Sequence, residues 1–313
     1  MGPARRAKFR FRIAARRWGL PVRRPRFGRR TALQDGMLYD AAPAPQTSWP
    51  VLAEHGPLQV RMASSKYEIK AAQRLRYHVF YEEMSAIPTR RMRIQKRDFD
   101  KYDRFCDHML VVDRDVLGVF GEPAVVGTYR LLRGEVAARH GGYYTASEYD
   151  LAALLANADR GMRCLELGRS CVVKSYRTKP ITMQLLWKGI MVYLERYRID
   201  VMFGCGSLPG TDPDALKLPL SYLHHFHRAP ESKQLRARPE LYVPMNRVPK
   251  DAIDQKAAMR KLPPLIKGYV RAGAIIGDGA VIDRQFGTTD VLIYFPVSRI
   301  GTRYRARLTH AAD

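Results

Sequence analysis

The sequence predicts an α+β fold, in which a mixed and mostly antiparallel sheet is flanked by helices. Segments with helix periodicity and segments with strand periodicity follow one another in mixed order along the chain. In addition, 46% of the 313 residues are hydrophobic, which is enough for one large core, with or without a small appended module. From this order alone, an α/β arrangement stays open beside the α+β one.

The expected elements follow from local patterns of apolar residues. Strands are expected at 58–63, 109–113, 124–132, 164–173 and 200–205. Helices are expected at 66–84, 147–157, 180–197 and 251–260. The block 263–297 ends in a further strand and forms part of a C-terminal extension.

Charge and composition divide the chain into four parts. Residues 1–30 hold twelve Arg or Lys and no acid, and the first acid is Asp35. Such a tail either lies on an anionic membrane surface or stays a disordered, solvated extension. Residues 31–57, rich in Ala, Pro and Gly, are expected to be a linker, 58–300 the folded domain and 301–313 a short tail.

The net charge of +24 predicts attraction to an acidic partner, which is a nucleic acid, an anionic lipid or an acidic protein. No recognised nucleic-acid-binding motif is present, so a nucleic acid is the least favoured of the three. No apolar run approaches the roughly 18 residues that cross a bilayer, and no secretory signal is visible. We therefore expect a cytoplasmic protein whose basic tail could touch the inner membrane.

Metal binding and disulfide chemistry are not expected. The four cysteines lack Cys-x-x-Cys spacing and lie among apolar residues, so we expect reduced core residues. His225 and His227 invite a metal interpretation, but Glu231 is the single acid near them, so no metal site is expected there.

A buried cation marks the first candidate site. Arg76 falls on the apolar arc of the helix at 66–84, where a guanidinium is costly unless a carboxylate pairs with it. The following segment offers four candidate partners, Asp98, Asp100, Asp103 and Asp107. Two interpretations stay open: a structural ion pair, or a set of charges that holds a substrate with an amine and a carboxylate.

Charged residues inside two apolar strands point to the same region. Arg130 lies in the strand at 124–132, while Glu166 and Arg169 lie in the strand at 164–173. Strict alternation would place Glu166 and Arg169 on opposite faces. A bulge at Gly168 would bring both to one face and bend the strand.

Lys174, Arg177 and Lys179 precede Pro180 at a plausible helix start, and this combination suits a phosphate. A solvated basic loop is the alternative. The segment lacks the glycines that wrap a pyrophosphate, which favours a ligand with one phosphodiester over a ligand with a pyrophosphate.

Asp283, Phe286 and Asp290 near the C-terminus could shape a pocket or could simply end a strand. The pattern favours the second interpretation.

Several motifs together resemble known families. The order "LRYHVF", "DFDKYD", "VGTYRLL" and "ELGR" is similar to the acyl-homoserine lactone synthases. In that match, the residues that align with the family's functional positions are Arg76, Phe80, Asp100, Asp103, Arg130, Glu166 and Arg169. Gly168 stands where that family has Ser, and the tail beyond residue 210 is longer.

The chain resembles more closely the ornithine–acyl carrier protein N-acyltransferases of bacterial ornithine-lipid synthesis. This likeness covers roughly residues 58–300, including "LELGRSCV", "GCGSLPGTDP", "YLHHFH" and "GDGAVIDRQFGTTDV". It implies a GNAT (N-acetyltransferase-like) fold, a 3-hydroxyacyl thioester on acyl carrier protein, L-ornithine as the acceptor and lyso-ornithine lipid as the product.

The resemblance also implies roles for the candidate residues. Glu166 would be the general base, and the Arg and Asp residues of the shared motifs would hold the amino acid. The phosphopantetheine arrives on the carrier protein, so no separate cofactor and no metal are expected. A related N-acyl amino acid synthase or acyl-homoserine lactone synthase is the alternative enzyme, and a basic nucleic-acid-binding protein is the alternative from another class.

Overall fold

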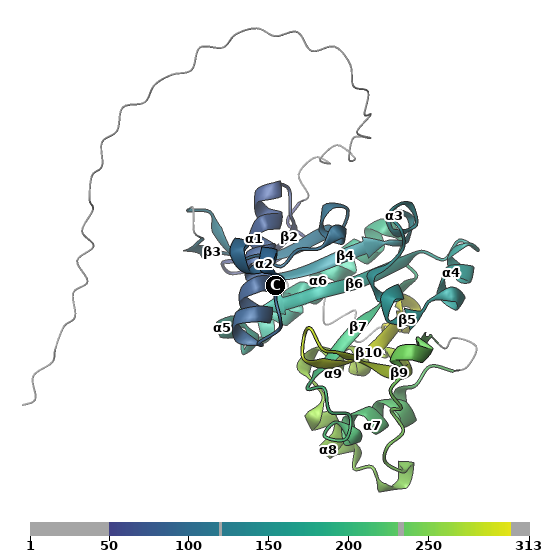
Figure 1. Ribbon diagram of the computed structural model, residues 1–313. Coiled ribbons are helices and arrows are strands. Elements are labelled where there is room, and N and C mark those ends of the chain that lie inside the picture. Colours follow the sequence, from purple (N-terminus) through teal and green to yellow (C-terminus); the bar gives the residue numbers. More distant parts are fainter. Residues whose placement is uncertain (1–49, 119–120, 231–234, 302–313) are drawn as a thin grey trace, which may run out of the picture. The chain divides into compact units, whose positions relative to one another are not determined.

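One ten-stranded sheet organises the part of the chain that the computed structural model describes, residues 50–118, 121–230 and 235–301. The strand order is β1-β2-β3-β4-β6-β7-β10-β9-β8-β5 (Figure 1). All neighbouring pairs are antiparallel except β6 with β7 and β8 with β9. The strands are β1 Ala53–His55, β2 Leu58–Met62, β3 Asp107–Leu117, β4 Pro123–Arg133, β5 Tyr149–Asp150, β6 Cys164–Val172, β7 Val201–Pro209, β8 Arg236–Ala237, β9 Ile275–Asp283 and β10 Thr288–Pro296.

Nine α-helices lie within the described residues. They are α1 Lys66–Tyr77, α2 Arg90–Gln95, α3 Gly134–Arg139, α4 Ala152–Ala158, α5 Lys174–Arg177, α6 Pro180–Tyr197, α7 Lys217–His227, α8 Gln255–Lys261 and α9 Pro264–Ala272. None of them is long and apolar enough to cross a membrane.

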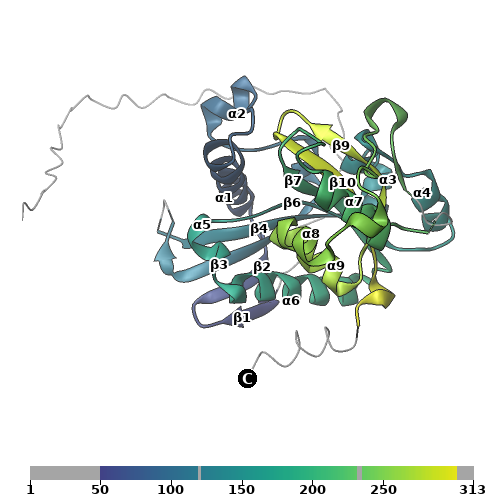
Figure 2. The ribbon, with the colours of Figure 1, turned by 90° about the horizontal axis from the view of Figure 1, so that it is seen from below.

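Helices cover both faces of the sheet, as the alternation along β3 requires. Met109 and Val111 belong to the core that includes α6, whereas Leu110 and Val112 pack with Ala72 of α1. Successive side chains of a strand point to opposite faces, so one apolar strand supplies both cores. Figure 2 shows α1 and α6 on opposite sides of β3 and β4.

Helix α1 starts at a cap and changes its winding near the site. The Ser65 side chain accepts a hydrogen bond from the N–H of Glu68, which stabilises the first turn. After Tyr77 the chain continues as a π-helix over His78–Glu83. Such segments are frequent at functional sites, and this one carries Phe80.

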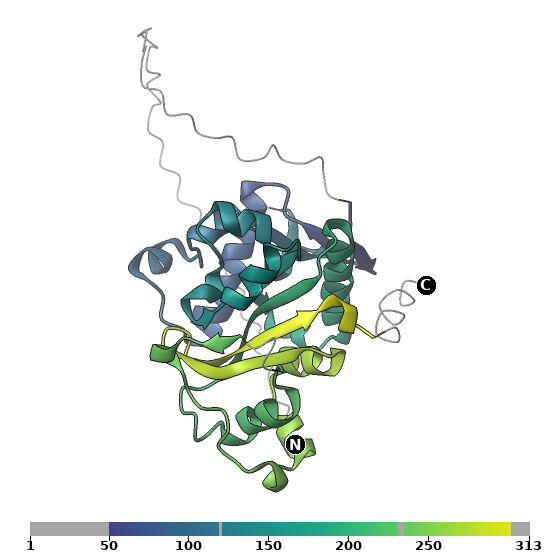
Figure 3. The ribbon, with the colours of Figure 1, turned by 90° about the vertical axis from the view of Figure 1, so that its right-hand side faces the viewer.

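The C-terminal extension completes the sheet. Strands β9 and β10 form a hairpin, and β10 pairs with β7 along its whole length (Figure 3). In β10, Ile293 and Phe295 face the core that contains α9, and Leu292 and Tyr294 face the opposite core. The extension is therefore an integral part of this sheet.

Each predicted strand and helix overlaps an observed one, but some bounds differ, and α2, α3, α5, α7 and α9 were not predicted. The sheet starts earlier than expected, because β1 lies inside the range predicted to be linker. The helix expected at 147–157 begins only at Ala152, since Tyr149 is fully buried and draws its segment into strand β5. The basic tail at 1–30, most of the linker and nearly all of the tail at 301–313 lie outside the described residues.

Candidate active site

A cavity of about 410 Å³ opens where β6 separates from β7. These two strands pair in parallel only from Cys164 to Glu166, and beyond Glu166 they diverge. The cavity lies beside the diverging part of β6, and its walls also come from the π-helix, from the start of α9 and from the β9–β10 hairpin. The basic and acidic residues that line the cavity are Arg130, Glu148, Glu166, Arg169, Arg177, Asp283 and Asp290.

A bulge in β6 turns the strand at this point. Between the pairs Thr128↔Cys171 and Arg130↔Gly168, the register advances by one more residue on β6 than on β4. Arg169 and Ser170 therefore lie opposite the single residue Tyr129, and Arg169 has a φ of 53°. The bulge was predicted at Gly168 and lies directly after it, and Glu166 and Arg169 both line the cavity, as that prediction requires.

Gly204 of β7 permits the close approach that begins the split. A Cβ atom at this position would lie 2.2 Å from the backbone oxygen of Leu167, so any other residue would push the strands apart.

Glu166 is buried and is held by backbone donors. Its two carboxylate oxygens accept hydrogen bonds from the N–H of Thr145, at 2.6 Å, and of Tyr144, at 3.0 Å. Burial raises the pKa of this carboxyl, while the hydrogen bonds from Thr145 and Tyr144 and the nearby charge of Arg130 act in the opposite direction. A carboxylate of raised pKa is a stronger base at neutral pH than an exposed one.

Arg76 is fully buried beneath the site and pairs with two of the predicted partners. Its Nε lies 2.8 Å from Asp98 Oδ2, and an η nitrogen lies 2.7 Å from Asp103 Oδ1. Burial by itself would lower the pKa of this guanidinium, but the charges of Asp98 and Asp103 raise it. The ion pair thus keeps Arg76 charged inside the core.

Arg130 and Arg169 extend this network to the cavity wall. Arg130 donates to both carboxylate oxygens of Asp100, at 2.7 and 2.8 Å. Arg169 lies 3.6 Å from Asp100 and 3.7 Å from Asp98, without hydrogen-bond geometry to either, and its guanidinium lies over the rings of Tyr144 and Phe286. The network of Arg76, Arg130 and Arg169 with Asp98, Asp100 and Asp103 contains three charges of each sign.

The structure brings most of the predicted site residues together. Phe80, Arg130, Glu166, Arg169 and Arg177 line the cavity, whereas Asp100 and Asp103 lie behind the arginines. Phe80 meets Phe286 edge to face, with ring centroids 5.6 Å apart.

The three predicted phosphate ligands separate in the structure. Arg177 donates from Nε to the Val172 oxygen and pairs with Glu83 at the cavity wall. Lys174 and Lys179 are exposed near the start of α6, and Lys179 lies 4.3 Å from the ring centroid of Tyr176. Neither lysine lines the cavity.

An acidic group occupies the other end of the cavity. Glu148 and Asp290 are buried there, and Cys205 Sγ lies 3.2 Å from Glu148 Oε2. Burial, followed by repulsion from Asp290, raises the pKa of Glu148 to about 7, and burial raises the pKa of Asp290 to about 6. We name Glu148, Asp283 and Asp290 the acidic pole.

The acidic pole corrects one sequence interpretation. Asp283 does cap the hairpin turn, because it accepts from the N–H groups of Gln285 and Phe286, but it also lines the cavity, as do Phe286 and Asp290. The favoured interpretation was that these residues merely end a strand, since nothing local shows that β10 pairs with β7 beside the site. Glu148 was missed altogether, because it lies in a predicted helix and no pattern around it signals burial.

Within the described residues, one group has a geometry that could hold a metal ion, namely Glu148, Cys205 and Asp290 with ligand atoms within 4.8 Å of one another. Burial raises the pKa of the Cys205 thiol well above its usual range, so the sulfur stays protonated. His225 and His227 instead contact the Val248 oxygen and the Tyr222 hydroxyl.

Comparisons with known proteins agree with the fold. Residues 75–188 match the acetyltransferase (GNAT) domain family, and the mixed, mostly antiparallel sheet is the predicted one. The chain is 50% identical over 264 residues to the L-ornithine N(alpha)-acyltransferase of Rhizobium meliloti (strain 1021), which covers 84% of this chain and 87% of that protein. It is 49% identical over 254 residues to the protein of the same name from Brucella abortus (strain 2308), covering 81% and 89%.

Among solved structures, an N-acyl amino acid synthase from uncultured soil microbes is similar at a TM-score of 0.44 and 10% identity, over 79% of this chain and 97% of that one. A similarity at this level carries no argument about activity.

Proposed function

The chain belongs to the family of the L-ornithine N(alpha)-acyltransferases. From this premise we propose that it transfers a 3-hydroxy fatty acyl group from acyl carrier protein to the α-amine of L-ornithine. The product of this reaction is lyso-ornithine lipid. The observation that supports this most is the cavity at the β6–β7 split, which joins a buried carboxylate to charged ends and apolar walls.

Glu166 acts as the general base in this proposal. An ammonium cannot attack a thioester, so a proton must first leave the α-amine, directly or through water. The nitrogen then attacks the carbonyl carbon, the carbon–sulfur bond breaks, and the departing pantetheine thiolate takes up a proton. The two backbone N–H groups that hold Glu166 fix its position for this transfer.

The donor arm binds along the part of β6 that has left β7. Backbone groups of a strand without a neighbour can pair with an extended ligand in the manner of an added strand. The same edge supplies N–H groups for the oxyanion that develops on the thioester carbonyl. Lys174, Arg177 and Lys179 stand near the start of α6, where they attract the phosphate of the arm.

The acyl chain and the acceptor use different walls. Val79, Phe80, Leu167 and Leu265 give the cavity an apolar side that suits a fatty acyl chain. Arg169 takes the α-carboxylate of the acceptor, since within the described residues its guanidinium makes loose ion pairs without hydrogen-bond geometry.

We also propose that the basic tail at 1–30 attracts the protein to anionic membrane surfaces, where the lipid product accumulates. Flotation with anionic liposomes should be weaker for a chain that lacks residues 1–49. Equal flotation of both chains would remove the tail from this role.

The proposed reaction is tested with the purified protein, 3-hydroxyacyl carrier protein and L-ornithine, followed by mass spectrometry of the product. We expect mono-acylated ornithine with the acyl group on the α-nitrogen. Acylation at the δ-nitrogen, or no turnover with any amino acid, would contradict the proposal. Equal turnover with acyl-CoA as the donor would contradict the proposal that the acyl group comes from acyl carrier protein.

A further inference from the structure

The acidic pole is the part of the cavity that the reaction as proposed does not use. We propose that Glu148 and Asp290, supported by Asp283, bind the side-chain ammonium of the acceptor and so select a diamino acid over a neutral amino acid. This inference rests on the proposed function. Glu148 lies within the 75–188 segment that matches the GNAT domain, whereas Asp283 and Asp290 lie outside it.

The two central carboxylates are buried without an ion-pair partner, and Arg169 acts on them from a distance only. Glu148 is 9% exposed and Asp290 is 6% exposed, and within the described residues no Lys, Arg or His pairs with either of them. The Cys205 thiol is the donor 3.2 Å from Glu148, and the Thr288 hydroxyl lies 2.8 Å from Asp290. A buried carboxylate that has only such neutral donors is costly to ionise, and a bound cation would remove that cost.

Glu148 offers an unused acceptor to the cavity. Its Oε2 accepts from the weak thiol donor, and its Oε1 has no hydrogen bond or ion pair within the described residues. Because Glu148 also lines the cavity, this side of its carboxylate is available to a ligand there. The unused acceptor is a second observation, beside the clustering of acids, that points to a cationic ligand.

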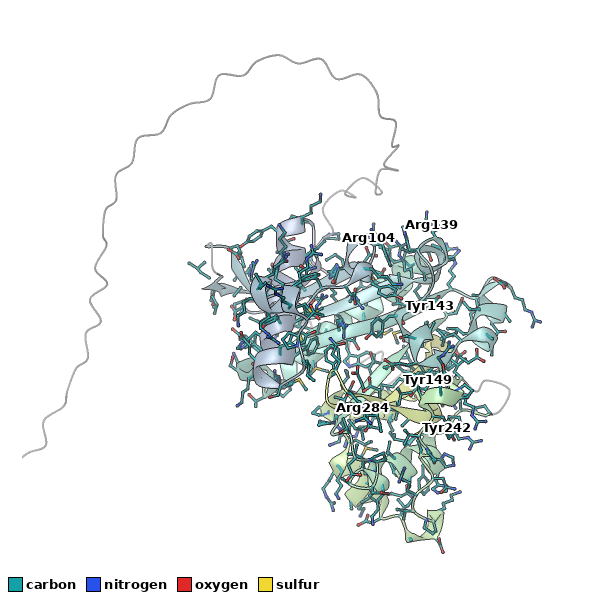
Figure 4. The ribbon with its side chains drawn as sticks, in the orientation of Figure 1. Arg104, Arg139, Tyr143, Tyr149, Tyr242 and Arg284 are labelled. Carbon is teal, nitrogen blue, oxygen red and sulfur yellow. The ribbon has the colours of Figure 1, made fainter. Side chains whose placement is uncertain are left out.

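The position of the pole is built into the core. The hydroxyl of Tyr149 donates to the backbone oxygen of Asp290 at 3.0 Å and approaches that of Gly279 at 3.3 Å. Tyr149 is fully buried, and Figure 4 labels it beside the C-terminal hairpin. One residue thus fixes the segment that carries Glu148 against the strand that carries Asp290.

A short chain of contacts leads from the base to the pole. Thr145 donates its N–H to Glu166 and lies with its hydroxyl 3.9 Å from Cys205 Sγ, which in turn contacts Glu148. Five bonds separate the two nitrogens of ornithine, which is a span of about 6 Å at ordinary bond lengths. An ornithine with its α-amine at Glu166 can therefore direct its second amine toward Glu148.

The other acids near the cavity do not serve this purpose. Asp100 and Asp103 are already neutralised by Arg130 and Arg76, and neither lines the cavity. An ammonium placed beside Arg76, Arg130 and Arg169 would be repelled by their charges. Of these two regions, only the acidic pole therefore attracts the side-chain ammonium of the acceptor.

The pole favours an organic ammonium over a metal ion. A thiolate is the metal-binding form of cysteine, yet burial and the nearby Glu148 keep the Cys205 thiol protonated. An ammonium needs only the carboxylates and leaves the thiol as it is. A metal requirement is therefore an outcome that the experiment must be able to reveal.

The experiment compares L-ornithine with L-norvaline, which has the same carbon chain but lacks the δ-amine. We measure kcat/KM for both acceptors with acyl carrier protein as the donor, in the full-length protein and in Glu148→Gln, Asp290→Asn and Glu240→Gln. Glu240 is exposed and does not line the cavity, and its partner Arg238 donates its backbone N–H to the backbone oxygen of Glu148, so Glu240→Gln is the control for loss of a surface carboxylate near the pole.

The unaltered protein should prefer ornithine by about 100-fold or more, because a buried polar site rejects an analogue that leaves it unpaired. Glu148→Gln and Asp290→Asn should each reduce that preference at least about tenfold, and Glu240→Gln should keep it. The comparison of the two acceptors in the unaltered protein holds even if a variant fails to fold.

Each other outcome identifies what has failed. Equal use of ornithine and norvaline by the unaltered protein, or full preference in both folded variants, overturns the inference and leaves the acyltransferase proposal standing. Loss of the preference with a chelator and its recovery with Zn²⁺ assigns the pole to a metal and also overturns it. Turnover of neither acceptor overturns the proposed function and the inference with it.

Discussion

Two charged regions border the same cavity, and they differ in whether their charges are paired. On the β4 and α1 side, three arginines and three aspartates neutralise one another at distances down to 2.7 Å. At the acidic pole, Glu148 and Asp290 have no ion-pair partner within the described residues, and Arg169 is the cation that acts on both from a greater distance. Paired buried charges are compatible with a purely structural role, whereas an unpaired buried carboxylate is costly to the fold and calls for a ligand.

The pKa directions express the same difference. Burial would raise the pKa of Asp98, but Arg76 and Arg169 hold it below its usual range. The pKa of Glu148 is instead raised to about 7, with Asp290, Asp283, Cys205 and Arg169 as the titratable or charged groups that face it. Asp98 in the paired region therefore stays charged near neutrality, whereas Glu148 in the pole changes its charge there.

The largest expected effect lies between the two regions, at the base. Glu166→Gln keeps the shape and removes the proton acceptor, so kcat should fall by about 10² to 10⁴ with little change in the KM for ornithine. Steady-state rates with ornithine measure this, and circular dichroism checks the fold. Near-normal turnover in the folded variant would remove Glu166 from this role.

Breaking the paired region should cost stability. Arg76→Met fills a similar volume but leaves Asp98 and Asp103 buried without their partner, so the free energy of unfolding should fall by about 3 to 5 kcal/mol. Urea denaturation at neutral pH measures the loss. A change below about 1 kcal/mol would show that the ion pairs do not carry the packing of this region.

Removing a charge from the pole should have the opposite sign. The folded-state pKa of Glu148 lies above its unfolded value, so its contribution to stability is present at low pH and is lost as the pH rises toward about 7. Glu148→Gln should therefore raise the free energy of unfolding by roughly 1 to 3 kcal/mol at pH 8, and the gain should shrink at pH 5. Thermal unfolding at the two pH values measures this. Destabilisation at pH 8 would count against an uncompensated charge.

The smallest expected effect concerns the exposed cations. Lys174→Glu and Lys179→Glu should each raise the KM for the acyl carrier protein a few-fold, with less change for ornithine, because exposed charges steer an acidic partner weakly. The effect should fade with added salt. Lys70→Glu, on the exposed side of α1, is the control, and an equal effect of that change would indicate unspecific attraction.

Sequence reasoning located the paired region and missed most of the pole. Arg76 and its carboxylate partners could be found because an arginine on an apolar helix face demands a counter-charge, and the next segment is rich in Asp. The bulge beside Gly168 followed from two charges of one short strand that needed a common face.

The pole could not be found in that way. Glu148 and Asp290 come together only because β10 pairs with β7 and because Tyr149 ties β5 to the hairpin. Neither residue interrupts an apolar pattern strongly enough to signal burial, and their proximity depends on pairing between distant segments. Lys174 and Lys179 illustrate the converse, because spacing grouped them with Arg177 but the structure leaves both outside the cavity.

The charge state of the pole on binding tests the central claim most directly. Ornithine and norvaline binding are measured by calorimetry at pH 6.5 in two buffers of different ionisation enthalpy, which gives the number of protons released. With pKa values of about 7 for Glu148 and about 6 for Asp290, a bound ammonium should ionise both, so ornithine should release about one proton more than norvaline. Equal proton release for the two ligands in the unaltered protein would contradict the account.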